Sequence, residues 1–374
     1  MTFSVDPIAL KGLSDLLDRA HDDADAARRY SWDESDLELT GEGLIYLLTG
    51  GHLEVRRGVM VWLGEVRDRA IGHTAVAVRD AVSHYQGADR ASAERVDRTI
   101  PGADVAGARD DLPPATPVMG PVAPSMVFTE QVEPQNALRE LPDYNDELPY
   151  VPTFPDLASP FALLRTAIYR VTDLASRIGI GDRAYDIAEV VLKPLVGDWA
   201  GLRACADVYR HTGEAVEQLG KNLLKAVDVM SLAWQGNAAD SCAVHLAHVA
   251  KALLDSTSQF NAIAAEYEGA AKGAHELSGT LGNLLNDIGD AALTAAAGST
   301  GWGLPVAVLL GGVALTKVYR VVHGIAEILK EVSRMQLYVS GINATIEGLG
   351  RVDSALTLPT VPALDRSTVP TGTR

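Results

Sequence analysis

The sequence predicts an all-α fold, and three observations support this class. Aromatic residues make up only 6% of the 374-residue chain, while alanine and leucine abound, which favours helices over sheets. Apolar residues recur at helical spacing over most of the chain. The exception is residues 100–160, which hold twelve of the 18 prolines. We therefore expect two long helical hairpins, together resembling a four-helix bundle, joined by a proline-rich linker and followed by C-terminal helices.

The first predicted hairpin covers residues 1–99. Asp6 can cap a helix whose first turn accommodates Pro7. The apolar positions that follow are Ile8, Leu10, Leu13, Leu16, Leu17 and Ala20. After a loop near residues 30–43, a second helical run is expected over residues 51–97. Within this run a Trp-x-Gly triplet lies where no turn is expected, so Trp62 is interpreted as a core or interface residue.

Residues 100–160 form the predicted linker. Each proline removes a backbone donor and fixes φ, so this segment should be extended and draped over the helices. The next unit, residues 161–350, begins with a helix that should end at Gly179 or Gly181. The Gly-x-Gly pair follows a helix instead of a strand, which is typical of a helix C-cap and not of a phosphate loop. A second short helix approaches Pro194, and Asp198 can cap a third.

In that third helix and the helix after it, apolar residues are spaced alternately three and four positions apart, as in a coiled coil, and each set forms an apolar seam. The first seam is Leu202, Cys205, Tyr209, Thr212, Val216, Leu219, Leu223, Ala226, Met230 and Ala233. The second is Cys242, Leu246, Val249, Leu253, Ser256, Phe260, Ile263, Tyr267 and Ala270. Between them, Trp234 supplies a large apolar plate and Gly236 a backbone free to take positive φ. We expect a sharp hairpin corner with Trp234 packed between its arms.

Two long helices joined by Trp-x-Gly resemble the Trp-x-Gly-type substrates of type VII (ESX) secretion, over about residues 191–350. The first hairpin resembles a sister family, the EspC-like excreted virulence factors, which begin with a Val-Asp-Pro helix and end near a Tyr-x-x-x-Asp/Glu element. Here that element is Tyr85 and Asp89. In the second hairpin Tyr267 is expected near the end of the returning helix, but Ala271 replaces the acid. The resemblance therefore places the secretion signal in the first hairpin.

Tyr85 and Asp89 are one helical turn apart, so both would lie on one face as an aromatic and acidic docking patch. A tyrosine beside an ordinary solvated acid is the alternative. The resemblance implies that the type VII machinery recognises a folded helical pair. The linker is long enough for intramolecular hairpin pairing, since tethering raises the effective concentration to roughly millimolar. A small Trp-x-Gly-type partner protein in trans is the alternative.

No catalytic site, metal or cofactor is expected. The chain lacks a nucleophile elbow and a zincin motif, so we do not predict an enzyme. Cys242, His245 and His248 could hold zinc only with further ligands. The net charge of −17 argues against nucleic-acid binding, because phosphates would be repelled. Cys205 and Cys242 are not expected to form a disulfide, since they fall at opposite ends of the hairpin.

Residues 291–316 carry no charge and are long enough to span a bilayer. Their many small residues and the central Pro305 make them a poor span, so we expect two short helices bent at residues 301–305 and packed on the bundle. The tail, residues 351–374, is expected to be flexible. The predicted function is a non-enzymatic type VII substrate, cytoplasmic before export and then secreted or held in the cell envelope. The alternatives are a toxin delivery module that inserts residues 291–316 into a membrane, and a cytoplasmic chaperone or adaptor for other substrates.

Overall fold

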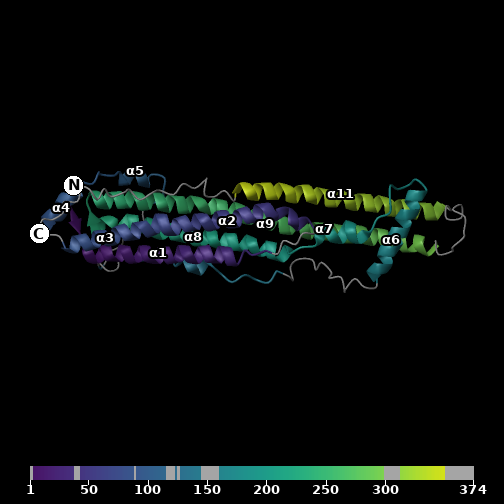
Figure 1. Ribbon diagram of the computed structural model, residues 1–374, viewed down its shortest axis with the longest axis horizontal. Helices are drawn as coiled ribbons and strands as arrows, with labels where there is room; N and C mark the ends of the chain where they lie inside the picture. Colours follow the sequence, from purple (N-terminus) through teal and green to yellow (C-terminus); the bar gives the residue numbers. More distant parts are fainter. Residues whose placement is uncertain are drawn as a thin grey trace.

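The computed structural model describes residues 3–37, 43–87, 90–114, 123, 127–144, 160–298 and 312–349. It is mostly helical, with 82% helix and almost no strands, which confirms the all-α fold. The long helices lie side by side in an extended rod (Figure 1). The first hairpin covers one half of the rod, and α11, Gly312–Leu349, covers the other half.

The first hairpin starts with α1, Pro7–Asp33. Its N-cap is Asp6, whose carboxylate accepts hydrogen bonds from the amides of Ile8 at 2.9 Å and Ala9 at 3.2 Å. The returning arm consists of η1 (Leu44–Leu48), α2 (Thr49–Glu65), the π-helical η2 (Val66–Gly72), α3 (His73–Gly87) and α4 (Arg90–Asp97). Trp62 is only 1% exposed and packs on the ring of Phe260. It is a core residue, as expected.

The second hairpin is formed by α8, Trp199–Ala233, and α9, Asn237–Gly298. Asp198 caps α8 by accepting a 2.7 Å hydrogen bond from the Gly201 amide. Every predicted seam residue of α8 is buried, and so is every one of α9 except the half-buried Cys242. The two helices approach closely at Gly213, where a Cβ would lie 2.7 Å from that of Phe260. The predicted seams are confirmed.

The predicted end of the returning helix near Tyr267 is wrong. The helix α9 continues to Gly298, and Tyr267 is fully buried in its middle. The residues beyond it contain glycines but no proline. Two of these glycines lie against α11, where a Cβ at Gly269 or Gly273 would be 3.0 Å from Tyr338. Packing against α11 therefore stabilises a helix that glycine alone would weaken.

Three helical elements lie between the linker and α8. The helix α6, Pro160–Arg177, is followed by Gly179, which has a φ of 75° and turns the chain out of the helix. The Ile180 amide donates to the Ala175 carbonyl at 2.9 Å, so the Gly-x-Gly pair is a helix C-cap, as predicted. The π-helical η5, Ala188–Leu192, and α7, Lys193–Leu195, follow.

The uncharged segment 291–316 is only partly described. Its first residues belong to the end of α9, where Ala291 and Ala292 are buried, and its last residues begin α11. Residues 299–311, including the expected bend at 301–305, lie outside the described residues, as does the tail 351–374. Within the described ranges, the helices include none with the length and apolar character needed to cross a membrane.

The two hairpins pack against each other within the chain. The helix α1 lies along α8, and buried apolar residues from both hairpins form one continuous core. Two parts of the linker are helical, contrary to the prediction: α5 (Val105–Arg109) and the single turn η4 (Pro134–Ala137). Residues 127–144, which we call the strap, lie against both α1 and α8.

The two cysteines are expected to remain reduced. Cys205 is buried near the start of α8, and Cys242 lies near the start of α9. Because the helices are antiparallel and rise 1.5 Å per residue, the thiols are separated by about 35 Å, far beyond disulfide reach. Thiol titration of the denatured, unreduced protein should find both thiols free. A protein without titratable thiol would contradict this hairpin geometry.

Candidate functional site

The corner between α8 and α9 lies at one end of the rod, beside the start of α1 and the end of α4 (Figure 1). The corner residues form a two-residue strand β2, Trp234–Gln235, paired antiparallel with β1, Ser4–Val5. The Asp6 amide also donates to the Ala233 carbonyl at 2.8 Å. The segment before α1 is therefore hydrogen bonded to the Trp-Gly corner of the other hairpin.

Gly236 is required at this corner for two reasons. Its φ is 138°, a conformation that other residues rarely adopt. A Cβ would also lie 2.6 Å from a carboxylate oxygen of Asp97. The corner therefore accepts only glycine without local rearrangement.

Asp97, the last residue of α4, caps α9. Its carboxylate accepts hydrogen bonds from the amides of Asn237 at 3.0 Å and Ala238 at 2.9 Å. The Asn237 side chain in turn donates to the Ile100 carbonyl at 2.8 Å. Asp97 is not among the residues predicted from the sequence. A signal was present, since an acid at a helix C-terminus opposes the helix dipole and suits the N-terminus of another helix better.

Trp234 is 4% exposed, and its ring contacts the first hairpin. The centroid of Tyr85 lies 6.0 Å away in an edge-to-face arrangement, and Tyr85 also packs on Phe3 at 5.8 Å. The sequence predicted burial of Trp234 between the arms of its own hairpin. It did not predict this aromatic contact with the end of the other hairpin.

Tyr85 is half-buried, so only part of its ring is available for the docking patch that the sequence predicts. Burial raises the pKa of its hydroxyl to about 12. The rest of the ring is covered in part by Trp234, which comes from the other hairpin and packs edge-to-face on Tyr85. Asp89, its predicted acidic neighbour, lies outside the described residues.

We define the corner site as Phe3, Tyr85, Asp97, Trp234 and Gly236. Its rim exposes two apolar side chains, Ile8 at 66% and Leu232 at 58%. Each of these lies within two residues of the hydrogen bond between Asp6 and Ala233. Exposed apolar side chains on a rigid, hydrogen-bonded support are suited to contact with another protein.

The cysteine and histidines considered as metal ligands do not converge. His245 is buried, with Nε2 3.4 Å from the Ala70 carbonyl, whereas His248 is exposed. In the part of the chain that the structure describes, no group of three or more potential ligands could hold a metal ion.

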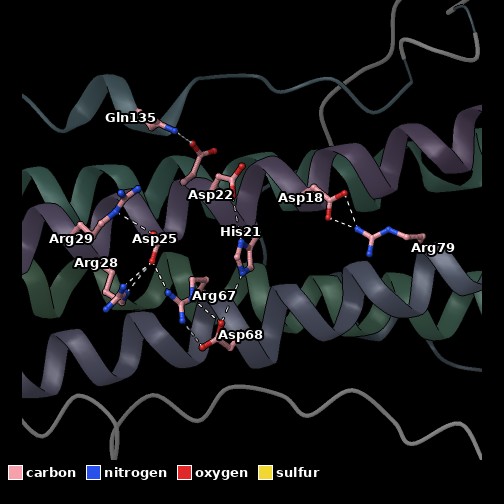
Figure 2. Close-up of polar contacts among 11 residues, drawn as sticks. Asp18, His21, Asp22, Asp25, Arg28, Arg29, Arg67, Asp68, Arg79 and Gln135 are labelled. Atoms are coloured by element: carbon pink, nitrogen blue, oxygen red, sulfur yellow. Dashed lines mark hydrogen bonds and ion pairs between the residues drawn. The ribbon is translucent and has the colours of Figure 1, made fainter.

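A charged network joins α1 to η2 and α3 (Figure 2). Asp25 accepts from Arg67 at 2.6 Å and from Arg28 at 2.9 Å. Arg67 also forms a double hydrogen bond with Asp68, at 2.7 and 2.8 Å, which holds the pKa of Asp68 below its usual range. These charges are directed at one another, so we interpret the network as a clamp that fixes the returning arm against α1.

A buried polar layer crosses the middle of the bundle. His52 of α2 is 1% exposed, and its Nδ1 lies 2.8 Å from the hydroxyl of Tyr267. The ring of Tyr209 lies 5.4 Å from that of Tyr267. Burial lowers the pKa of His52 to about 4. This layer therefore links α2 of the first hairpin to α8 and α9 of the second.

Comparison of the chain with known protein families, curated proteins and solved structures finds no match. The resemblance to type VII substrates therefore depends on the motif residues alone.

Proposed function

We propose that this chain is a non-enzymatic substrate of type VII (ESX) secretion, exported as a folded helical bundle and acting afterwards through protein contacts. The observation that carries the proposal is the corner site. It brings Tyr85, from the end of the first hairpin, against Trp234 of the Trp-x-Gly corner in the second.

The geometry supports this function in a specific way. The two motifs that resemble type VII elements are 149 residues apart in sequence, at Tyr85 and Trp234, yet they meet at the same end of the rod. The strand pairing of Val5 with Trp234 and the Asp97 cap fix their relative positions. An exporter that reads both elements together would therefore recognise the folded chain and reject the unfolded one.

Export is expected to require Asp89. We expect Asp89 to act in recognition and not in folding, so Asp89→Ala should change the free energy of unfolding by less than about 0.5 kcal/mol. It should abolish appearance of the protein outside the cell. The measurement is fractionation of cells and medium, with an exporter-deficient strain as the reference for no export.

The matched control is Asp80→Ala, which removes an exposed acid of α3 and should be exported normally. Tyr85→Ala is a weaker test, because it also removes a ring that packs on Trp234. Normal export of a folded Asp89→Ala protein would show that this element is not the signal.

A further inference from the structure

The strap, residues 127–144, lies along the junction between the two hairpins. It contacts α1 and α8 alternately, from Phe128 near Gly12 to Tyr144 beside Asp207. On α1 it passes residues 12–30, and on α8 it passes residues 225–207 in the opposite direction. Each span of 18 residues corresponds to about 27 Å of helix. The strap therefore follows the groove between the two hairpins over much of the length of α1.

The α8 side of the groove binds the strap backbone through one buried residue. Asn222 is 2% exposed. Its Oδ1 accepts from the amides of Gln131 at 2.8 Å and Val132 at 3.2 Å, and its Nδ2 donates to the Val132 carbonyl at 2.7 Å. One side chain thus satisfies three backbone groups at the point where the strap bends.

The α1 side holds the strap through charged and polar side chains. Arg19 pairs with Glu130 at 2.5 Å, and Gln135 donates to Asp23 at 2.8 Å. Further along, the Tyr30 hydroxyl donates to the Arg139 carbonyl at 2.8 Å. The Arg139 side chain crosses to α8, where it pairs with Glu214 at 2.5 Å. Neither hairpin alone supplies the complete groove.

We propose that the strap is a latch that selects the chain's own second hairpin as the partner of the first. A tether raises the local concentration of that partner, but a tether alone does not bind to either hairpin where the two meet. The strap binds only when α1 and α8 lie side by side, so its binding free energy is added to that of pairing. A small Trp-x-Gly-type protein that displaced the second hairpin would lack Asn222 and Glu214 and would lose the strap. The inference requires only the observed hairpin pairing and is independent of export.

The test is an exchange experiment on the full chain. Tagged and untagged copies are mixed, and mixed species, in which hairpins have paired between copies, are counted by native mass spectrometry. A mixed species can form only after a chain's own two hairpins separate, so the rate of mixing measures how firmly the strap holds them together. Wild-type protein should therefore mix slowly. Replacing residues 127–144 with a Gly/Ser segment of equal length keeps the tether and removes the latch. This replacement, and also Asn222→Ala, should increase the rate of mixing about tenfold or more, the effect of losing several net hydrogen bonds.

Two controls make the result decisive. Lys221→Ala removes an exposed neighbour of Asn222 that pairs with Glu217 of the same helix, and it should mix at the wild-type rate. A synthetic peptide of residues 127–144, added to the strap-replaced protein, should slow the mixing again, which a merely misfolded chain would not show. Mixing of the strap-replaced protein at the wild-type rate, or a peptide without effect, would overturn the proposal.

Discussion

Trp234→Ala is expected to lower the free energy of unfolding by about 3–5 kcal/mol, the usual cost of truncating a large buried aromatic residue. The indole is 4% exposed and packs on the ring of Tyr85, and alanine would remove both the burial and this contact. Chemical denaturation monitored by circular dichroism would measure the change.

Leu232→Ala is the matched control, because Leu232 is two residues away and 58% exposed. We expect it to change the free energy of unfolding by no more than about 0.5 kcal/mol. If the two variants unfold at the same denaturant concentration, the indole is not part of the core and the corner is held by its backbone alone.

Acidification is expected to destabilise the fold through His52. Its pKa falls from 6.5 to about 4 on folding because of burial, with a further contribution from Arg56. Above pH 6.5 the imidazole is neutral in both states. As pH falls from 6.5 to 4, the unfolded chain binds a proton that the folded chain does not, so stability is lost across this window. A difference of this size corresponds to about 3 kcal/mol.

Other titratable groups also change the free energy of unfolding with pH, some raising it and others lowering it as the pH falls. The test therefore compares variants. Burial also lowers the pKa values of His211 and His245, whereas it raises that of Asp23. His52→Gln should flatten the dependence of unfolding free energy on pH between 6.5 and 4 relative to wild type. A His52→Gln protein with the wild-type slope would show that His52 titrates normally.

Much of the fold follows from local sequence signals. The seams of α8 and α9 repeat at coiled-coil spacing, so their burial could be read from the sequence. Asp6, Asp198 and Gly179 are caps of ordinary type. The Trp-Gly corner was predictable because few other pairs supply a large ring beside a positive φ.

The parts that were missed depend on contacts between distant residues. The sequence around Tyr267 contains glycines that weaken a helix, and only packing against α11 explains why α9 continues. Asp97 caps a helix that begins 140 residues later. The strap has no periodicity of its own, because its order comes from Asn222 and from side chains of α1. For the same reason the contact of Tyr85 with Trp234 could not be derived from either motif alone.

The unbroken length of α9 has a hydrodynamic consequence. Its 62 residues correspond to a helix about 93 Å long, whereas a compact domain of 374 residues would have a radius of gyration of about 21 Å. A thin rod as long as α9 would have a radius of gyration of about 27 Å from its length alone. The molecule should therefore diffuse and elute as a larger particle than its mass suggests. Moving lengthwise, it would present only the cross-section of a few packed helices to a narrow opening.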